Sequence, residues 1–403
     1  MTEVSRRNVL SLGAALGLGT ALVPAGAGWS WNPSGSIAGA TADPRDPNWV
    51  WDDEIDQIMA DLVDRGEVAA TNKALLKWVN NSDTVPRELS PDLRAWLVEH
   101  SKLPDWADRK LLLHSGDVSR RLDTHFLILY GIGGGIMSTV IPREAKAVYW
   151  SKGGADMQDR AAKTFSFGYD LAELKGFEPQ GQFLTTATKT RITHAAVRHL
   201  LPQSPHWRAV ADETIPISNA DILVTFHSTG TFAHMKLKEW GFLKNKKDDE
   251  AFLHSWQVAL HMLGVQEQFI PHSWDEAETQ SRQVLTPILA PTLEGKDLAE
   301  QLLSLTAQLD AGLTRGLLNE FARYLLSNEI GDWLGLKRDY AAAALLKVAW
   351  PTYMAFRRGT IPFLPLAYYG LDQFIRAFAM AFLNRWQDTK TTPITIPDIN
   401  RPS

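Results

Sequence analysis

The chain of 403 residues contains no cysteine. It therefore forms no disulfide, binds no zinc through thiolates and has no cysteine nucleophile. The same absence excludes covalent attachment of a prosthetic group through a C-x-x-C-H motif. The stability of the folded chain must come from its apolar core, and no cofactor can be attached through a cysteine thioether.

Positive charge is also scarce. The sequence has 41 Lys and Arg residues against 46 Asp and Glu residues, a net charge of −5. Without basic clusters, this balance argues against nucleic acid as a partner. Hydrophobic residues at 45% and charged residues at 22% are ordinary for a globular protein that buries a large core. The 15 tryptophans are unusual, and large rings suit both a broad core and apolar ligand surfaces.

The sequence has no convincing transmembrane run. Near the N-terminus, Arg6 and Arg7 precede an apolar run that ends at Val23, a pattern typical of a twin-arginine export signal. That run is only about 15 residues long and is rich in Gly and Ala, which is short for a membrane span. We expect removal of a signal peptide, residues 1–42, by cleavage after Ala27 or Ala42. The mature chain is then extracellular, without a stable membrane anchor, and its net charge is −6 because Arg6, Arg7 and Glu3 are lost.

A second apolar stretch, residues 361–383, carries Asp372 and Arg376 and two prolines. These residues disfavour a membrane span. We expect a buried helix there, or the lining of an apolar channel.

Strand and hairpin signals are lacking, as are internal repeats. From residue 44 onward, apolar residues recur at helical intervals, so we predict one all-α domain over residues 43–390, followed by an extended tail, residues 391–403. The polar run over residues 244–249 indicates a solvated loop. Helices are predicted over residues 52–65, 72–80, 90–100, 106–114, 118–129, 155–171, 187–201, 219–240 with a break, 250–263, 296–313, 316–327 and 339–348.

Two familiar catalytic motifs are missing. The glycines from Gly131 to Gly135 do not form a phosphate-binding loop, because the G-x-G-x-x-G spacing fails at Ile136. They predict a turn that allows close backbone approach. The sequence also has no G-x-S-x-G elbow, which argues against a hydrolase.

Two predicted helices carry the most informative polar side chains. In the first, Arg160, Lys163 and Thr164 share one face because they are three and four residues apart. The second carries His194, with Arg191 and Arg198 about one turn away on either side. His199 is five residues from His194 and therefore points elsewhere, so the two histidines are a poor pair for one metal ion.

A longer stretch surrounds these helices. The run STVIPREAKAVYWSKGGADMQDRAAKT, followed by KTRITHAAVRHLLPQSPHW, resembles the latex clearing proteins, the haem b rubber oxygenases. The similarity extends over most of the mature chain. It implies a globin-like helical core that holds haem b, with additional N- and C-terminal helices, in a monomer. It also implies oxidative cleavage of the double bonds of cis-1,4-polyisoprene by O2, which gives oligo-isoprenoids with aldehyde and ketone ends.

The resemblance implies roles for single residues. His194 matches the proximal iron ligand of the family, and Lys163 matches a distal residue that ligates iron in the closed state. Arg160 and Thr164 match neighbours of that lysine. Glu144 matches a proposed catalytic base, which we expect to remove an allylic proton. Its place at the third position of a helix that begins at Pro142 also predicts a helix-capping role, and the two roles are compatible.

Two further hypotheses remain open at this stage. Because Arg191 and Arg198 flank His194, we expect one of them to pair with a haem propionate. The alternative function is a secreted, non-catalytic carrier or sensor of haem or apolar ligands. Product formation from polyisoprene distinguishes this carrier from the oxygenase.

Overall fold

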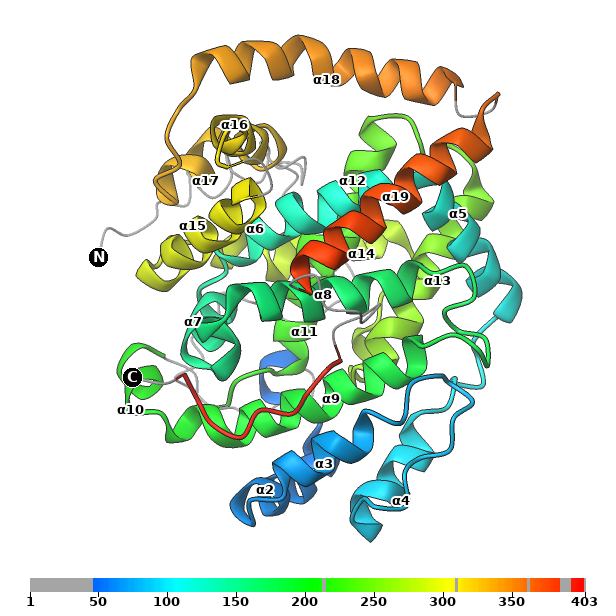
Figure 1. Ribbon diagram of the computed structural model, residues 1–403, viewed down its shortest axis with the longest axis vertical. Coiled ribbons are helices and arrows are strands. Elements are labelled where there is room, and N and C mark those ends of the chain that lie inside the picture. Colours follow the sequence, from blue (N-terminus) through cyan, green and yellow to red (C-terminus); the bar gives the residue numbers. More distant parts are fainter. Residues whose placement is uncertain (1–45, 212–214, 309–310, 361–362, 385–392, 402–403) are drawn as a thin grey trace.

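Helices form nearly all the regular structure in the part of the chain that the computed structural model describes, residues 46–211, 215–308, 311–360, 363–384 and 393–401 (Figure 1). Those residues contain no β-strand, and Ser151 and Asn400 form an isolated bridge. The all-α prediction is confirmed. The predicted signal peptide lies outside the described residues.

A layer of short N-terminal helices packs beneath α9 (Figure 1). Ile55, Met59 and Leu62 recur at helical spacing and are fully buried, and they belong to one apolar cluster with Ile192 and Ala195 of α9. Burial of this face holds α9 in place from below. The elements of this layer are η2 Asp53–Ile55, α2 Asp56–Asp64, α3 Val68–Leu75 and α4 Pro91–His100, and the preceding turn, η1 Pro47–Trp49, packs on α11.

The central helices include α8 and α9, which lie side by side and run in opposite directions (Figure 1). Asp156 caps α8 by accepting a hydrogen bond from the backbone N–H of Asp159. The elements of this central part are α5 Arg109–Ile128, η3 Leu129–Gly134, α6 Gly135–Ser138, α7 Pro142–Trp150, η4 Lys152–Ala155, α8 Met157–Ala172, α9 Phe183–Leu200, η5 Leu201–Gln203 and α10 Pro205–Val210.

The rest of the chain covers this centre. Its long helix α13 packs along α5, and α19 packs on another side of α5. These elements are α11 Asn219–Phe226, η6 His227–Thr231, α12 Phe232–Glu239, α13 Lys246–Met262, η7 Glu267–Phe269, α14 Trp274–Val284, η8 Thr286–Ile288, α15 Leu293–Ala307, α16 Arg315–Leu325, α17 Asn328–Trp333, α18 Tyr340–Thr360 and α19 Pro365–Leu383.

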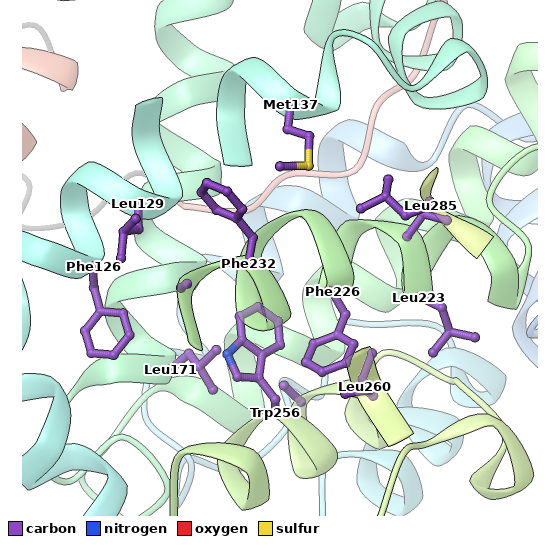
Figure 2. Packing of buried hydrophobic residues seen from close by; sticks show 14 of the residues in the cluster. Phe126, Leu129, Met137, Leu171, Leu223, Phe226, Phe232, Trp256, Leu260 and Leu285 are labelled. Atoms are coloured by element: carbon purple, nitrogen blue, oxygen red, sulfur yellow. The ribbon is translucent and has the colours of Figure 1, made fainter. Parts of the chain in front are cut away.

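Aromatic rings fill the main core (Figure 2). The ring of Phe226 lies 5.3 Å from that of Trp256, and the ring of Phe126 lies 5.1 Å from that of Phe252. Rings at such distances add to the stability gained from burying their area. Part of the unusual tryptophan content therefore stabilises the core, and Trp256 also lines the cavity described below.

Two π-helical turns, η3 and η6, contact each other beside this core. A Cβ atom on Gly133 would lie 2.6 Å from Cε1 of Phe232, and one on Gly134 would lie 2.6 Å from Cγ2 of Thr229. Only glycine fits such a close approach. The predicted role of the Gly131–Gly135 stretch is confirmed, and wide turns of this kind are frequent next to functional sites.

Some predicted boundaries were wrong. Residues 244–247 are exposed to solvent, as predicted, but the run is not a loop throughout, because Asn245 caps α13 and the helix begins at Lys246. Asp248 is buried there and bonds to His114 at 2.7 Å and to Arg121 at 3.1 Å. Two partners distant in the sequence therefore bury Asp248 in the first turn of α13. The predicted helix over residues 72–80 begins earlier and ends at Leu75. The two helices predicted over residues 106–114 and 118–129 form one helix, α5, which begins at Arg109, ends at Ile128 and is kinked at Leu122.

The stretch expected to form a buried helix, residues 361–383, is only partly buried as α19. Phe374 is 67% exposed and Phe378 is 43% exposed, while Asp372 is buried. Asp372 accepts hydrogen bonds from Thr124 of α5 and from Arg357 of α18. These bonds turn the face of α19 that carries Asp372 toward the protein interior. No single helix of the described chain is both long and apolar enough to cross a membrane. One bent pair of helices, Arg109–Ser138 with Pro142–Trp150, has the length and apolar composition of a span, with an angle of 91° between its two parts.

Residues 393–401, here called the C-terminal segment, have no helix and lie along α9 (Figure 1). Asn72 exchanges two 2.9 Å hydrogen bonds with the backbone of Ile396. Asn400 donates to the carbonyl of Leu200 at 2.6 Å. The segment is therefore fixed by side chains and backbone groups far from it in sequence.

Candidate active site

A cavity of about 620 Å³ lies between α8 and α9 and extends to α5, α7, α11, α13 and the C-terminal segment. Its size is in the range of about 300–1,000 Å³ that is common for cofactor and ligand sites. Apolar and aromatic side chains dominate the walls. The cavity brings together five predicted site residues: Glu144, Arg160, Lys163, Thr164 and His194.

The two facing helices supply four of these residues. Arg160, Lys163 and Thr164 all lie on the cavity face of α8, as their spacing predicted. On α9, the cavity face consists of Thr190, Thr193, His194 and Val197. The antiparallel packing of α8 and α9 thus places one histidine opposite a lysine, an arginine and a threonine.

His194 has the properties of a metal ligand. Burial, then the positive charges of Arg198 and Arg160, lower its pKa to about 3, so the imidazole is neutral at ordinary pH. A neutral imidazole is the form that binds metals. Its Nδ1 atom is buried and makes no hydrogen bond to the described residues.

The donor set around His194 restricts which metal site is chemically consistent. The described residues contain no cluster of three or more His, Asp or Glu side chains able to hold an ion. A single neutral histidine therefore fits a metal that brings its other ligands with it, as a haem does. The neutral ring and the apolar walls agree with such a group.

Glu144 is the third residue of α7, as predicted. Burial raises the pKa of its carboxyl group to about 8, although the hydrogen bond from Thr225 acts in the opposite direction. Thr225 Oγ1 donates to Oε1 at 2.6 Å. No hydrogen bond links this carboxylate to the described backbone at the start of α7. The geometry thus favours a role in the cavity over helix capping, and a pKa near neutrality is what a general base requires.

Arg160 is a further ionisable group on the wall. Burial lowers its pKa, whereas the nearby Glu144 raises it. Its guanidinium group forms no hydrogen bond or ion pair within the part of the chain that the structure describes. A buried cation that faces a cavity favours an anionic group of a ligand there.

Lys163 is tied to two oxygen atoms. Its Nζ lies 2.8 Å from Oδ2 of Asp159, one turn earlier on α8, and donates to Oγ1 of Thr395 at 2.8 Å. Thr395 belongs to the C-terminal segment and lines the cavity. The lysine therefore lies at the junction of α8 and that segment.

Arg191 and Arg198 lie outside the cavity wall, so the expectation that one of them binds a haem propionate requires correction. Arg191 forms two hydrogen bonds, at 2.5 and 2.6 Å, to the carboxylate of Asp52. Arg198 contacts Asp56 at 2.7 Å and is buried. Arg191 is three residues before His194 and Arg198 four residues after it, so their side chains point about 60° and 40° away from His194 around the helix axis. Both therefore face the N-terminal layer. They tie α9 to η2 and α2.

The sequence interpretation missed two parts of the site. Thr225 comes from α11 and gave no signal of its own, because a threonine in an apolar helix is ordinary. The C-terminal segment contributes Ile394, Thr395, Ile396 and Pro397 to the wall. The alternation of Ile and Pro with polar residues in this tail was its only visible sign.

An all-helical fold around a cavity with a neutral histidine and an acid of raised pKa is suited to an oxygenase, and comparisons with known proteins assign that class. Residues 118–368 match the family described as "ER-bound oxygenase mpaB/B'/Rubber oxygenase, catalytic domain". The chain is 47% identical, over 411 aligned positions that cover all of both proteins, to "Rubber oxygenase" from Streptomyces sp. (strain K30). It is also similar to a solved structure of latex clearing protein in the closed state, with 47% identity and a TM-score of 0.79, which covers 92% of this chain and 99% of that one. The chain belongs to the latex clearing protein family of rubber oxygenases.

Proposed function

We propose that this protein is a secreted haem b dioxygenase that cleaves the double bonds of cis-1,4-polyisoprene, with products that end in an aldehyde and a ketone. The observation that carries the proposal is the neutral His194 on the wall of an apolar cavity that Glu144 also lines. The similarity to a rubber oxygenase over the whole chain supports polyisoprene as the substrate.

The residues present fit a noncovalent haem. His194 would hold the iron as its proximal ligand, and Arg160 supplies a cation for an anionic edge of the group. Thioether attachment is excluded because the chain has no cysteine. When bound, haem supplies the iron centre that activates dioxygen.

The apolar part of the cavity suits a hydrocarbon chain. Phe126, Leu127, Phe165 and Leu260 are among its lining residues, and they provide no hydrogen-bonding groups on their side chains. An isoprene chain has none either, so its burial here leaves no polar group unpaired. Which double bond reacts therefore depends on how far the isoprene chain has entered the cavity and on the few polar groups near Glu144.

Glu144 is assigned the role of general base for an allylic proton of the substrate. Thr225 occupies Oε1, and Oε2 makes no hydrogen bond to the described residues, so Oε2 is the atom that takes the proton. This role requires the carboxylate form. Because the pKa is about 8, the fraction of carboxylate rises as the pH increases through that value.

Lys163 would be a second iron ligand in a closed form, and Thr164 would contribute to the distal side. Export by the twin-arginine pathway is proposed from Arg6 and Arg7 and the apolar run that follows them. An insoluble polymer cannot enter a cell, so an enzyme that cleaves it must reach it outside.

An absorption spectrum of the purified mature protein, joined to a product assay, tests this proposal. We expect a strong Soret band that shifts after reduction and addition of carbon monoxide, and carbonyl-ended oligomers from polyisoprene latex with consumption of O2. Without a Soret band after expression with adequate haem, the haem mechanism is wrong. Full haem loading without product would leave a carrier or sensor of haem as the function.

A further inference from the structure

The C-terminal segment forms part of the cavity wall beside Lys163. Thr395 accepts a hydrogen bond from Lys163 Nζ at 2.8 Å, and Asp159 Oδ2 lies 2.8 Å from the same nitrogen. These contacts join α8 to a segment more than two hundred residues away in the sequence. A lysine nitrogen that is held by an ion pair and a hydrogen bond has no lone pair free for a metal.

The position of Thr395 is fixed by its neighbours. The adjacent residue, Ile396, is 3% exposed, and its backbone N–H and carbonyl both bond to Asn72. Further along, the guanidinium group of Arg401 donates to the carbonyls of Tyr149 and Gly154 at 3.1 Å. The hydroxyl of Thr395 is therefore held against α8 by bonds on its C-terminal side.

We propose that Thr395 is a positioning residue which, with Asp159, holds the Lys163 ammonium away from the haem iron. The C-terminal segment then determines how much of the resting protein has an open distal side. This inference rests on the proposed function, because it requires bound haem and Lys163 as its alternative ligand.

The two partners of Lys163 contribute differently. Asp159 is one turn away on the same helix and moves with α8, so it can hold the charge of the lysine but cannot couple it to another element. Thr395 comes from a separately anchored segment. Displacement of that segment removes one of the two bonds and frees the lysine to turn toward the cavity. A hydrogen bond to a charged group is strong enough to bias such an equilibrium.

The test compares the parent protein with Thr395→Val, with Thr395→Ser and with Thr395→Val combined with Asp159→Asn. The readouts are the resting ferric spectrum and the apparent Kd for cyanide from a Soret titration. In the combined variant we expect a six-coordinate, nitrogen-ligated spectrum and cyanide binding at least about tenfold weaker, since a lysine on the iron must leave first. Thr395→Ser keeps the hydroxyl and should behave like the parent.

Two controls separate positioning from general damage. Ile399 lies on the same segment and is 50% exposed, so Ile399→Thr should leave the spectrum unchanged. In a Lys163→Ala background, the changes at Thr395 and Asp159 should no longer alter cyanide binding. Circular dichroism and haem content verify that each variant is folded.

Each outcome decides the inference. A parent without a Soret band would overturn both the proposed function and this inference. A haem-loaded parent whose Thr395 and Asp159 variants bind cyanide as it does would overturn the inference alone. The same conclusion would follow if the effect persisted without Lys163, or if the parent were already fully ligated by lysine.

Discussion

Thr225 of α11 and Glu144 of α7 are 81 residues apart, yet Thr225 Oγ1 donates a 2.6 Å hydrogen bond to Oε1 of Glu144 inside the cavity. Burial raises the pKa of this carboxyl group to about 8, and the threonine limits that increase because it stabilises the charged form. The pair therefore controls at which pH the proposed base becomes active.

Glu144→Gln should retain haem but lose roughly 10²-fold or more of the cleavage rate, the usual contribution of a general base. The parent rate should increase with pH through about pH 8, because the carboxylate is the active form. The rate of O2 consumption on polyisoprene latex, measured from pH 6 to pH 10, checks both statements. Unchanged turnover in the variant would show that Glu144 is not the base.

Thr225→Val should move the rise of the pH profile to higher pH. Loss of the hydrogen bond removes a contact that favours the carboxylate, so the pKa of Glu144 must increase. At pH 7 the variant should be slower than the parent, and the two rates should converge at high pH. A profile displaced to lower pH would contradict the assignment of Glu144 as the titrating group.

His194→Ala should abolish haem retention, because His194 is the proposed proximal ligand. His199→Ala is a matched control on the same helix: His199 pairs with the exposed Asp64 at the protein surface and does not line the cavity. The ratio of Soret absorbance to protein absorbance after purification measures the difference. A His194 variant with full haem and the parent spectrum would refute the ligand assignment.

Lys163→Ala should keep haem bound and remove from the resting spectrum the contribution of the lysine-ligated fraction, in which Lys163 has left Thr395 and Asp159. The change should appear in the absorption spectrum of the ferric protein before any substrate is added. An identical spectrum in the variant and the parent would mean that the resting protein contains no lysine-ligated iron.

Arg191→Ala should lower the free energy of unfolding by about 3–5 kcal/mol, because it leaves Asp52 buried without its partner. Haem content of the folded protein should be unchanged, since Arg191 does not line the cavity. Arg65→Ala is the control. Its partner Glu67 is exposed, so the loss should be below about 1 kcal/mol. Unfolding in denaturant measures both free energies. Loss of haem from folded Arg191→Ala protein would show that Arg191 binds the cofactor after all.

The periodicity of apolar residues was enough to predict the all-α class and to place α8 and α9. It failed where polar residues have distant partners. The polar run at the start of α13 looked like a loop because the pairing of Asp248 with His114 and Arg121 is not visible in one stretch of sequence. In α9, the spacing predicted Arg191 and Arg198 on the same side of the helix as His194. Their side chains point about 40–60° away from it around the helix axis, and that difference is enough for them to face the N-terminal helices and not the cavity.

The sequence by itself determined a helical chain without thiols and the spacing that puts Arg160, Lys163 and Thr164 on one face, because helical period and residue chemistry are local properties. Tertiary structure decided what those faces meet. The packing of α8 against α9 places His194 opposite them, and burial makes that histidine neutral and raises the pKa of Glu144. The fold alone brings Thr395 to Lys163, because a contact between distant residues depends on how every helix between them packs.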